Sequence, residues 1–171
     1  MFPTPKPALT PNTYAYESTP LVKPTGFREY DARWLLEKEI NLMGVQALGV
    51  GLGTLIRELN VKPEIVTGHD FRSYSSAVKM ALVSGLMASG CKVYDIGLAI
   101  TPMAYFAQFD LNVPCVAMVT ASHNDNGWTG VKMGANRPLT FGPVEMKRLK
   151  EIVLGAKFDF RAGGSYEFVE N

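Results

Sequence analysis

The sequence predicts an α/β domain of three layers, in which helices cover both faces of a mostly parallel (mixed) sheet. Short apolar runs with strand character alternate with longer segments of helical spacing between residues 41 and 154. Glycines stand at several boundaries between the two kinds of segment. At 171 residues, the chain is long enough to bury a hydrophobic core of its own.

The expected elements begin with a helix and then alternate. Helices are predicted at residues 41–59, 75–89, 103–109 and 143–154, and strands at 64–67, 92–96, 115–119 and 131–133. Gly90 is placed to end the second helix. Thr101 followed by Pro102 is a start signal for the third helix, a capping hydroxyl and then a proline at the first helical position.

The first helix contains four glycines, including the run Gly49-Val50-Gly51-Leu52-Gly53. Glycine weakens an isolated helix, so its repeated use indicates close approach to a neighbouring element. A nucleotide-binding fingerprint would need G-x-G-x-x-G spacing directly after a strand, and this stretch has neither. We therefore expect these glycines to serve helix packing.

Both ends of the chain differ from its middle. Six of the eleven prolines fall within residues 1–24, which predicts an extended and poorly packed arm over residues 1–26. The folded domain is expected at residues 27–155. Residues 156–171, which include Gly163 and Gly164, are expected to form a linker or the start of the crossing to a second domain.

Composition excludes several classes of function. The formal net charge is +1 and the basic residues form no stripe, which argues against a nucleic-acid partner. No apolar segment is long enough to span a bilayer, and prolines interrupt the N-terminus where a signal peptide needs an apolar run. We expect a cytoplasmic protein in which Cys91 and Cys115 are buried free thiols.

Polar side chains gather where two of the expected strands end. One strand leads into Gly68-His69-Asp70, and another leads into Thr120-Ala121-Ser122-His123. Ligands of open α/β sheets collect at the carboxyl ends of the strands. Small residues and glycines around Ser122 would let backbone amides approach an anion on its hydroxyl. The sequence therefore predicts the functional site at this end of the sheet.

Two other chemistries could use the same residues. A serine hydrolase fits poorly, because the G-x-S-x-G elbow is absent and Ser122 and His123 are adjacent, so that they point to opposite sides of an extended segment. A metal site could in principle combine His69, Asp70, His123 and Asp125, but no established metal-binding spacing is present. Asn126-Gly127 is also a turn signal in its own right.

Four stretches together resemble the α-D-phosphohexomutases, the family of phosphomannomutases and phosphoglucomutases. The loop Thr120–Asn124 with Gly130-Val131-Lys132 is similar to the family's catalytic serine loop. Three further stretches resemble its F-R-x-Y-D, strand-end and T-P motifs in the same order, namely residues 27–33, 66–72 and 97–102. The sequence departs from the family pattern with Trp34, His69 and Asp125.

The resemblance implies the N-terminal, catalytic-serine domain of a four-domain enzyme that interconverts hexose 1-phosphate and hexose 6-phosphate. Ser122 would carry the phosphoryl group, and a hexose bisphosphate would be both intermediate and activator. Lys132 would act as general acid/base or electrostatic partner, His123 would assist proton transfer, and Arg33 would shape the sugar's surroundings. The residues implied in substrate binding are Tyr30, Arg33, Asn124 and Lys132.

The resemblance also implies a Mg²⁺ ion held by the phosphate on Ser122 and by an Asp-x-Asp-x-Asp loop of the next domain, a triplet absent from this sequence. The expected partners are therefore a hexose phosphate and the remaining mutase domains. This chain alone is expected to fold, to lack turnover and to self-associate through the surface that meets the second domain. The alternative is a free-standing sugar-phosphate-binding or interaction domain without turnover.

Overall fold

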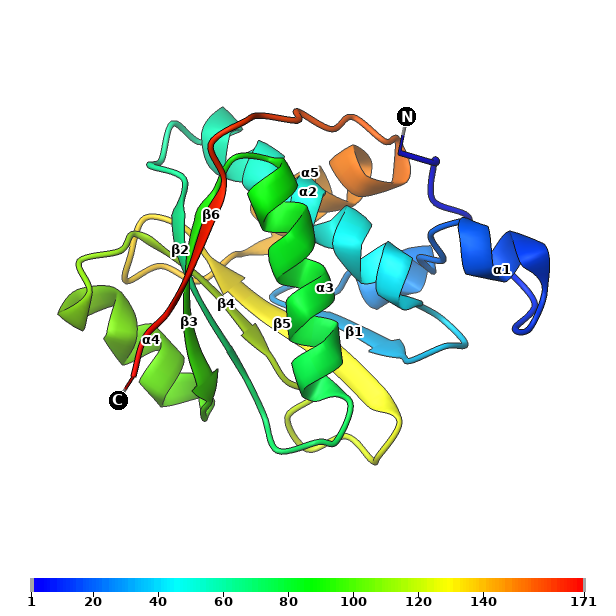
Figure 1. Cartoon of the computed structure of the whole chain (residues 1–171), viewed down its shortest axis with the longest axis horizontal. Coiled ribbons are helices and arrows are strands. Elements are labelled where there is room, and N and C mark those ends of the chain that lie inside the picture. Colours follow the sequence, from blue (N-terminus) through cyan, green and yellow to red (C-terminus); the bar gives the residue numbers. More distant parts are fainter. Residues whose placement is uncertain (1, 171) are drawn as a thin grey trace.

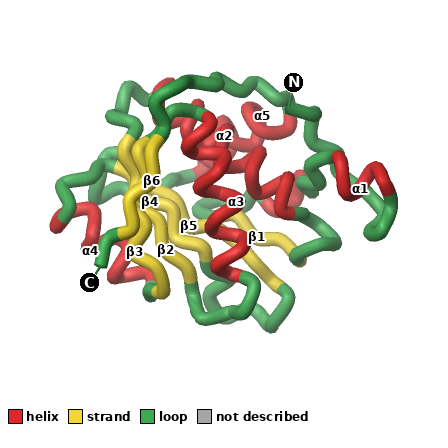
Figure 2. The backbone as a smooth tube through the Cα atoms, in the orientation of Figure 1, coloured by secondary structure: helices red, strands yellow, loops and turns green. Residues whose placement is uncertain are grey.

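The computed structural model describes residues 2–170 and shows one six-stranded sheet in the order β1-β5-β4-β2-β3-β6 (Figures 1 and 2). β2, β3, β4 and β6 run parallel, whereas β5 runs antiparallel to both of its neighbours. The mostly parallel, mixed sheet is therefore confirmed. The strands are β1 (Ala32–Leu35), β2 (Glu64–His69), β3 (Lys92–Leu98), β4 (Cys115–Val119), β5 (Trp128–Gly134) and β6 (Ser165–Phe168).

Helices cover both faces of the sheet, which gives the expected three layers. On one face, α2 (Leu42–Glu58), α3 (Ser75–Ala88) and α5 (Pro143–Leu154) enclose the larger hydrophobic core. On the other face, α4 (Thr101–Asp110) packs over a smaller core (Figure 1). β4 is buried along its whole length. A strand buried on both faces needs apolar residues at successive positions, which explains the unbroken apolar run of β4.

The glycines of α2 allow it to lie directly against α3. A Cβ atom at Gly49 would come within 2.2 Å of the Leu82 carbonyl oxygen, and one at Gly85 within 2.0 Å of the Gln46 carbonyl oxygen. No side chain fits in such spaces, so the two helices require glycine at both positions. The packing interpretation of the α2 glycines is therefore correct.

The N-terminal segment is not the extended, poorly packed arm that its prolines predict. It contains a short helix, α1 (Tyr14–Ser18), and a 3₁₀ turn at residues 24–26, and both Leu21 and Val22 are fully buried. Asn41 explains the difference: its side chain caps α2 at Gly44, accepts from the Leu21 amide and donates to backbone carbonyls of the segment. One buried amide thus ties the arm to the first core helix.

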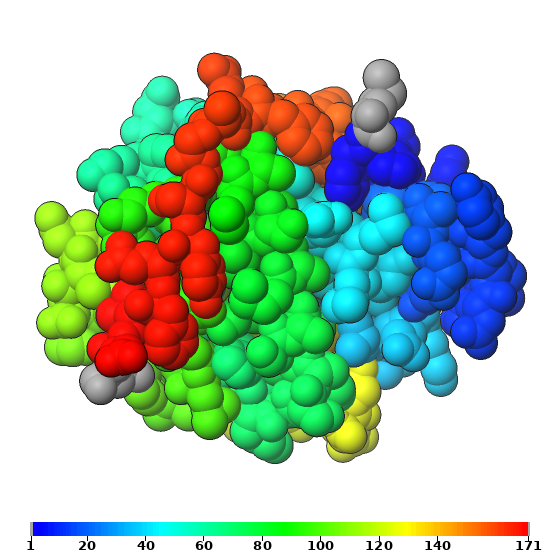
Figure 3. Space-filling model, in the orientation of Figure 1, coloured from blue at the N-terminus to red at the C-terminus, as the bar shows by residue number. Residues whose placement is uncertain are grey.

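The C-terminal segment crosses the ends of α2 and α3 and then adds β6 to the edge of the sheet beside β3 (Figures 1 and 3). Its path is fixed by the hydrogen bond from the Arg161 amide to the Ala88 carbonyl and by close contact of Gly164 with Met87. The side chains of β6 are all exposed, so this strand lacks the apolar signal that identifies the inner strands.

Two further details of the predicted elements were wrong. α4 begins at Thr101 with Ile100 as its cap, so the Thr101 hydroxyl does not cap the helix. β2 and β3 each extend two residues further than predicted, and β5 begins three residues earlier and ends one residue later than predicted. Gly90 does adopt left-handed backbone, at φ 78°, at the end of α3. Within residues 2–170, no helix is both long and apolar enough to cross a membrane.

Candidate functional site

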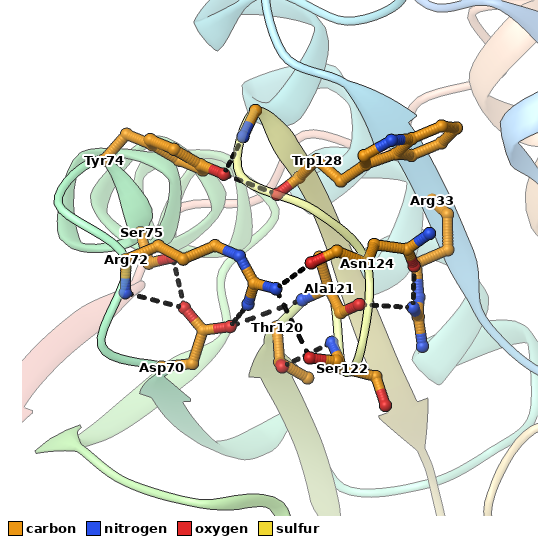
Figure 4. A network of polar contacts seen from close by, with 11 residues as sticks. Arg33, Asp70, Arg72, Tyr74, Ser75, Thr120, Ala121, Ser122, Asn124 and Trp128 are labelled. Atoms are coloured by element: carbon orange, nitrogen blue, oxygen red, sulfur yellow. Dashed lines mark hydrogen bonds and ion pairs between the residues drawn. The ribbon is translucent and has the colours of Figure 1, made fainter.

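The polar loop that follows β4 lies beside the end of β2. The Asp70 amide donates to the Val119 carbonyl at 3.0 Å, and the Thr120 amide donates to Gly130 of β5 at 3.0 Å. These bonds align the carboxyl ends of β2 and β4, which are adjacent parallel strands. The two polar stretches found in the sequence therefore meet at one end of the sheet (Figure 4).

Ser122 sits in this loop in an unusual backbone conformation. Its φ of 52° lies in the left-handed region, which costs a non-glycine residue about 1 kcal/mol or more. The Ser122 amide donates to the Thr120 hydroxyl at 3.0 Å, a local turn that supports this conformation. Ser122 also lines a cavity of about 560 Å³, whose other walls come from the ends of β2 and β3 and the start of α4.

Arg72 braces the serine loop from the β2–α3 connection. Its guanidinium donates to the carbonyl oxygens of Ser122 at 3.3 Å and Asn124 at 2.6 Å. The same side chain is paired with Asp70, and both side chains are buried. Breaking a buried pair leaves an uncompensated charge, so the two residues hold each other and the loop in place.

Asp70 also collects hydrogen bonds from three other groups. Its carboxylate accepts from the Ser75 hydroxyl at 2.5 Å, the Arg72 amide at 3.2 Å and the Ala121 amide at 3.4 Å. Burial alone would raise the pKa of Asp70. Hydrogen bonds from Ser75, Arg72 and Thr120, together with the Arg72 charge, outweigh burial and lower this pKa below its ordinary value. Asp70 is therefore a buried carboxylate that stays ionised.

Arg33 holds the loop from the opposite side. This buried arginine of β1 donates through Nη1 to the Ala121 carbonyl and to the Asn124 Oδ1 atom, both at 2.6 Å. Its Nε and Nη2 atoms donate to Asp31 at 3.0 and 2.8 Å. A guanidinium has five N–H donors, so these four bonds leave one for a ligand.

Lys132 stands on β5 next to this arrangement. Its ammonium lies 3.8 Å from Asp31, the carboxylate that also pairs with Arg33, and its side chain is 30% exposed. Tyr30 is 58% exposed and lines a second cavity of about 340 Å³ together with Asp31 and Lys132. Thr101 and Pro102 line both this cavity and the one at Ser122, so the two hollows adjoin.

The loop tip carries the remaining candidates. His123 and Asp125 are exposed, and among the contacts of residues 2–170 the side chain of neither makes a hydrogen bond or ion pair. The structure thus brings Arg33, Asn124 and Ser122 together and places Lys132 and Tyr30 beside them. His123 lies on the same loop but does not join the network.

Charge at the site is nearly balanced. Arg33, Arg72 and Lys132 pair with the carboxylates Asp31 and Asp70, which leaves one net positive charge within this group of five side chains. The arrangement can receive an anion on the serine. It does not fully neutralise a phosphate monoester, which carries nearly two negative charges at neutral pH.

The metal-binding alternative gains no support from the geometry. In the part of the chain that the structure describes, no three histidine, cysteine or acidic side chains lie close enough to hold an ion. Asp70 is occupied by Arg72 and Ser75. The Nδ1 atom of His69 is buried without a hydrogen-bond partner in the described structure, and burial lowers the pKa of this imidazole.

Sequence reasoning did not assign roles to Asp31, Arg72 and Tyr74, and it considered Asp70 only as a possible metal ligand. The signal for Asp70 and Arg72 was present, because both lie directly after the end of β2 in a polar stretch. Tyr74 gave no signal, since a tyrosine before a helix predicts no contact with a loop more than fifty residues away.

The fold and the site define an α/β/α domain with a strained serine at the sheet end, braced by two arginines and flanked by a lysine. Residues 24–159 match the family model described as phosphoglucomutase/phosphomannomutase, alpha/beta/alpha domain I. The chain belongs to this family, and it contains that domain.

Curated and solved relatives agree with the family. The chain is 36% identical over 108 residues to a phosphoglucomutase/phosphomannomutase of Thermococcus kodakarensis, covering 63% of this chain and 24% of that protein. It is 36% identical over 151 residues to the phosphomannomutase of Salmonella typhimurium, covering 85% and 32%. A Burkholderia thailandensis phosphoglucomutase/phosphomannomutase family structure superposes with a TM-score of 0.79 at 26% identity, covering 88% and 34%. The chain thus spans about a quarter to a third of these relatives.

Proposed function

We propose that this domain supplies the phosphoserine of an enzyme that interconverts hexose 1-phosphate and hexose 6-phosphate, with mannose or glucose as the sugar. The observation that carries the proposal is the Ser122 loop, which presents one serine in strained backbone between Arg33 and Arg72. Phosphoryl transfer depends mainly on positioning and charge stabilisation, and a braced, cation-flanked loop offers both.

In the proposed reaction, the phosphoserine gives its phosphoryl group to a hydroxyl of the hexose phosphate. The bond from phosphorus to Ser122 Oγ breaks and a bond from phosphorus to the sugar oxygen forms, while the proton of the sugar hydroxyl is transferred to Ser122 Oγ, which becomes a free hydroxyl. The hexose bisphosphate then reorients in the site and returns its other phosphoryl group to Ser122 Oγ. Lys132 is the general acid/base or electrostatic partner that the geometry favours, because its ammonium lies on the cavity beside the loop.

The geometry favours different roles for the other candidate residues. The four hydrogen bonds of Arg33 favour a role in shaping the loop and its charge, with one donor left for a sugar. Tyr30 lines the cavity next to Lys132 and is available to a substrate. Asn124 keeps its amide donors, and exposed His123 is free to reach a bound ligand.

The proposed cofactor is Mg²⁺, and this chain would supply only one of its ligands. The phosphate on Ser122 would be the sole ligand from this domain. A bound Mg²⁺ would supply positive charge. The five paired side chains beside Ser122 leave about one negative charge of a phosphoserine unneutralised, so a cation held jointly with another domain suits the site.

The test is a coupled assay of the longer mutase expected to contain this domain, with glucose 1-phosphate or mannose 1-phosphate, Mg²⁺ and a hexose bisphosphate. Ser122→Ala should lower kcat by at least about 1,000-fold, because the covalent step is removed. Ser84→Ala, at an exposed serine of α3, is the matched control and should keep parental kcat. A Ser122→Ala enzyme with parental kcat would contradict the proposal.

A second candidate function is binding of sugar phosphates without turnover. It is favoured by the excess of positive charge among the paired side chains beside the cavity at Ser122, which can attract a sugar phosphate without any covalent step. Calorimetry of the isolated chain with hexose phosphate distinguishes the two, since a binding domain should bind its ligand without help from other domains.

A further inference from the structure

Tyr74 connects the start of α3 to the far half of the serine loop. Its hydroxyl donates to the Trp128 carbonyl at 2.8 Å and accepts from the Gly127 amide at 2.7 Å (Figure 4). A phenolic hydroxyl has one proton to donate, so the single donor of Tyr74 is used in this contact. The side chain thereby fixes two successive residues of the loop.

The position of Tyr74 in the sequence is unusual for a helix start. It is the residue that caps α3, where Ser, Thr, Asp or Asn would normally accept a helix amide. Tyr74 makes no capping hydrogen bond. Tyr74 thus stands where a capping residue would be favoured, and its side chain binds a distant loop instead. Such departures from local sequence preference are expected at functional sites.

Tyr74 and Arg72 divide the loop between them. Arg72 holds the carbonyls of Ser122 and Asn124, whereas Tyr74 holds Gly127 and Trp128. Gly127 has a φ of 98°, a conformation that glycine adopts readily, and its carbonyl accepts from Leu36 at 2.9 Å. The β2–α3 connection therefore forms hydrogen bonds with the loop on both sides of its exposed tip.

We infer that Tyr74 is a positioning residue for phosphoryl transfer, holding the second half of the loop so that Ser122 keeps its left-handed backbone. This inference rests on the proposed function. The Tyr74 hydroxyl bonds only backbone atoms of Gly127 and Trp128, its ring packs against the larger core, and the residue lines neither the cavity at Ser122 nor that at Lys132. Its removal should therefore slow the reaction without weakening substrate binding.

The first test needs no activity. In the 171-residue chain, Tyr74→Phe keeps the ring and removes the hydroxyl, and the Gly127 amide should then exchange its hydrogen at least about tenfold faster. Tyr166→Phe is the matched control, because the Tyr166 hydroxyl bonds Asp95 at 2.8 Å on β3, away from the loop. This control should lower the melting temperature and leave Gly127 exchange unchanged. Unchanged Gly127 exchange in Tyr74→Phe would reject the role.

The second test uses the active mutase. Tyr74→Phe should lower kcat about tenfold and leave KM within about twofold, and Tyr166→Phe should change neither by that much. Faster Gly127 exchange with parental kcat would also overturn the positioning role. A parental enzyme without mutase activity would instead reject the proposed function and, with it, the catalytic role of Tyr74. The hydrogen-exchange result would still decide whether Tyr74 holds the loop.

Discussion

Arg33 and Asn124 lie 91 positions apart in the sequence, yet the Nη1 atom of one is 2.6 Å from the Oδ1 atom of the other. The contact joins an edge strand, β1, to the loop after β4. The contact is possible because β5 pairs with both β1 and β4, which places β1 near the loop that follows β4. The serine loop is therefore held by the order of the sheet as well as by its own turn.

The first prediction concerns Lys132. Lys132→Met should lower kcat of the mutase by about 100-fold or more, because it removes a proton-transfer or charge-stabilising group. The free energy of unfolding should change by only about 0.5 kcal/mol, since the side chain is partly exposed and its pair with Asp31 is long.

The control for that prediction is Lys147→Met at an exposed position of α5. Steady-state kinetics and thermal melting of both variants are the measurements. Equal kcat for Lys132→Met and Lys147→Met would remove Lys132 from the reaction.

The second prediction tests the strain at Ser122. Because φ is 52°, Ser122→Gly should be more stable than Ser122→Ala by about 1 kcal/mol. At exposed Ser84 within α3 the order should reverse, with alanine more stable than glycine by a similar amount. Urea unfolding of the four variants measures both differences. The same order at both sites would show that Ser122 is not held in left-handed backbone.

The third prediction concerns the pH dependence of the Asp70 brace. The pKa of Asp70 is lower in the folded chain, so its contribution is present above the unfolded pKa and is lost as pH falls through the folded pKa. At pH 7, Asp70→Asn should destabilise the chain by roughly 3 kcal/mol, because it leaves buried Arg72 without its partner charge.

That difference between parent and Asp70→Asn should shrink as the pH falls below about 4. Asp110→Asn, at an exposed position of α4, removes the same charge without touching the loop and is the control. Denaturant unfolding at a series of pH values measures the effect. A difference that grows at acid pH would contradict the ionised brace.

The fourth prediction is that the 171-residue chain folds but does not isomerise hexose phosphates. Water reaches the cavity at Ser122 and screens Lys132, and no second domain retains the bisphosphate. Exposed Phe71, Leu98 and Ile100 around that cavity should promote self-association. A coupled assay and sedimentation measure the two properties. Steady turnover that disappears in Ser122→Ala would contradict the prediction.

Much of the fold could be predicted because the inner elements carry strong local patterns. The bounds of β4 and α5 agree with those predicted from apolar runs and helical spacing. β1 and β6 could not be found in this way. β1 is a four-residue edge strand whose partner lies about 95 residues away, and β6 presents only exposed side chains. Their place depends on pairing with the rest of the sheet.

The site shows the same division. Ser122 and Lys132 could be proposed from the sequence, since they belong to one continuous stretch after a predicted strand. The contacts of Tyr74 and Asp31 could not, because they arise only when the folded sheet brings distant segments together. The packing of Leu21 and Val22 was missed for the same reason, as it depends on Asn41 at the start of α2.

Mapping the phosphate is the most direct test of the central claim that Ser122 carries the phosphoryl group. The mutase expected to contain this domain should be incubated with a hexose bisphosphate, and its intact mass and peptides then measured. One phosphate should be found, on the peptide that contains Ser122, and it should be absent from Ser122→Ala and present in the Ser84→Ala control. A phosphate on another residue, retained in an active Ser122→Ala enzyme, would contradict the account.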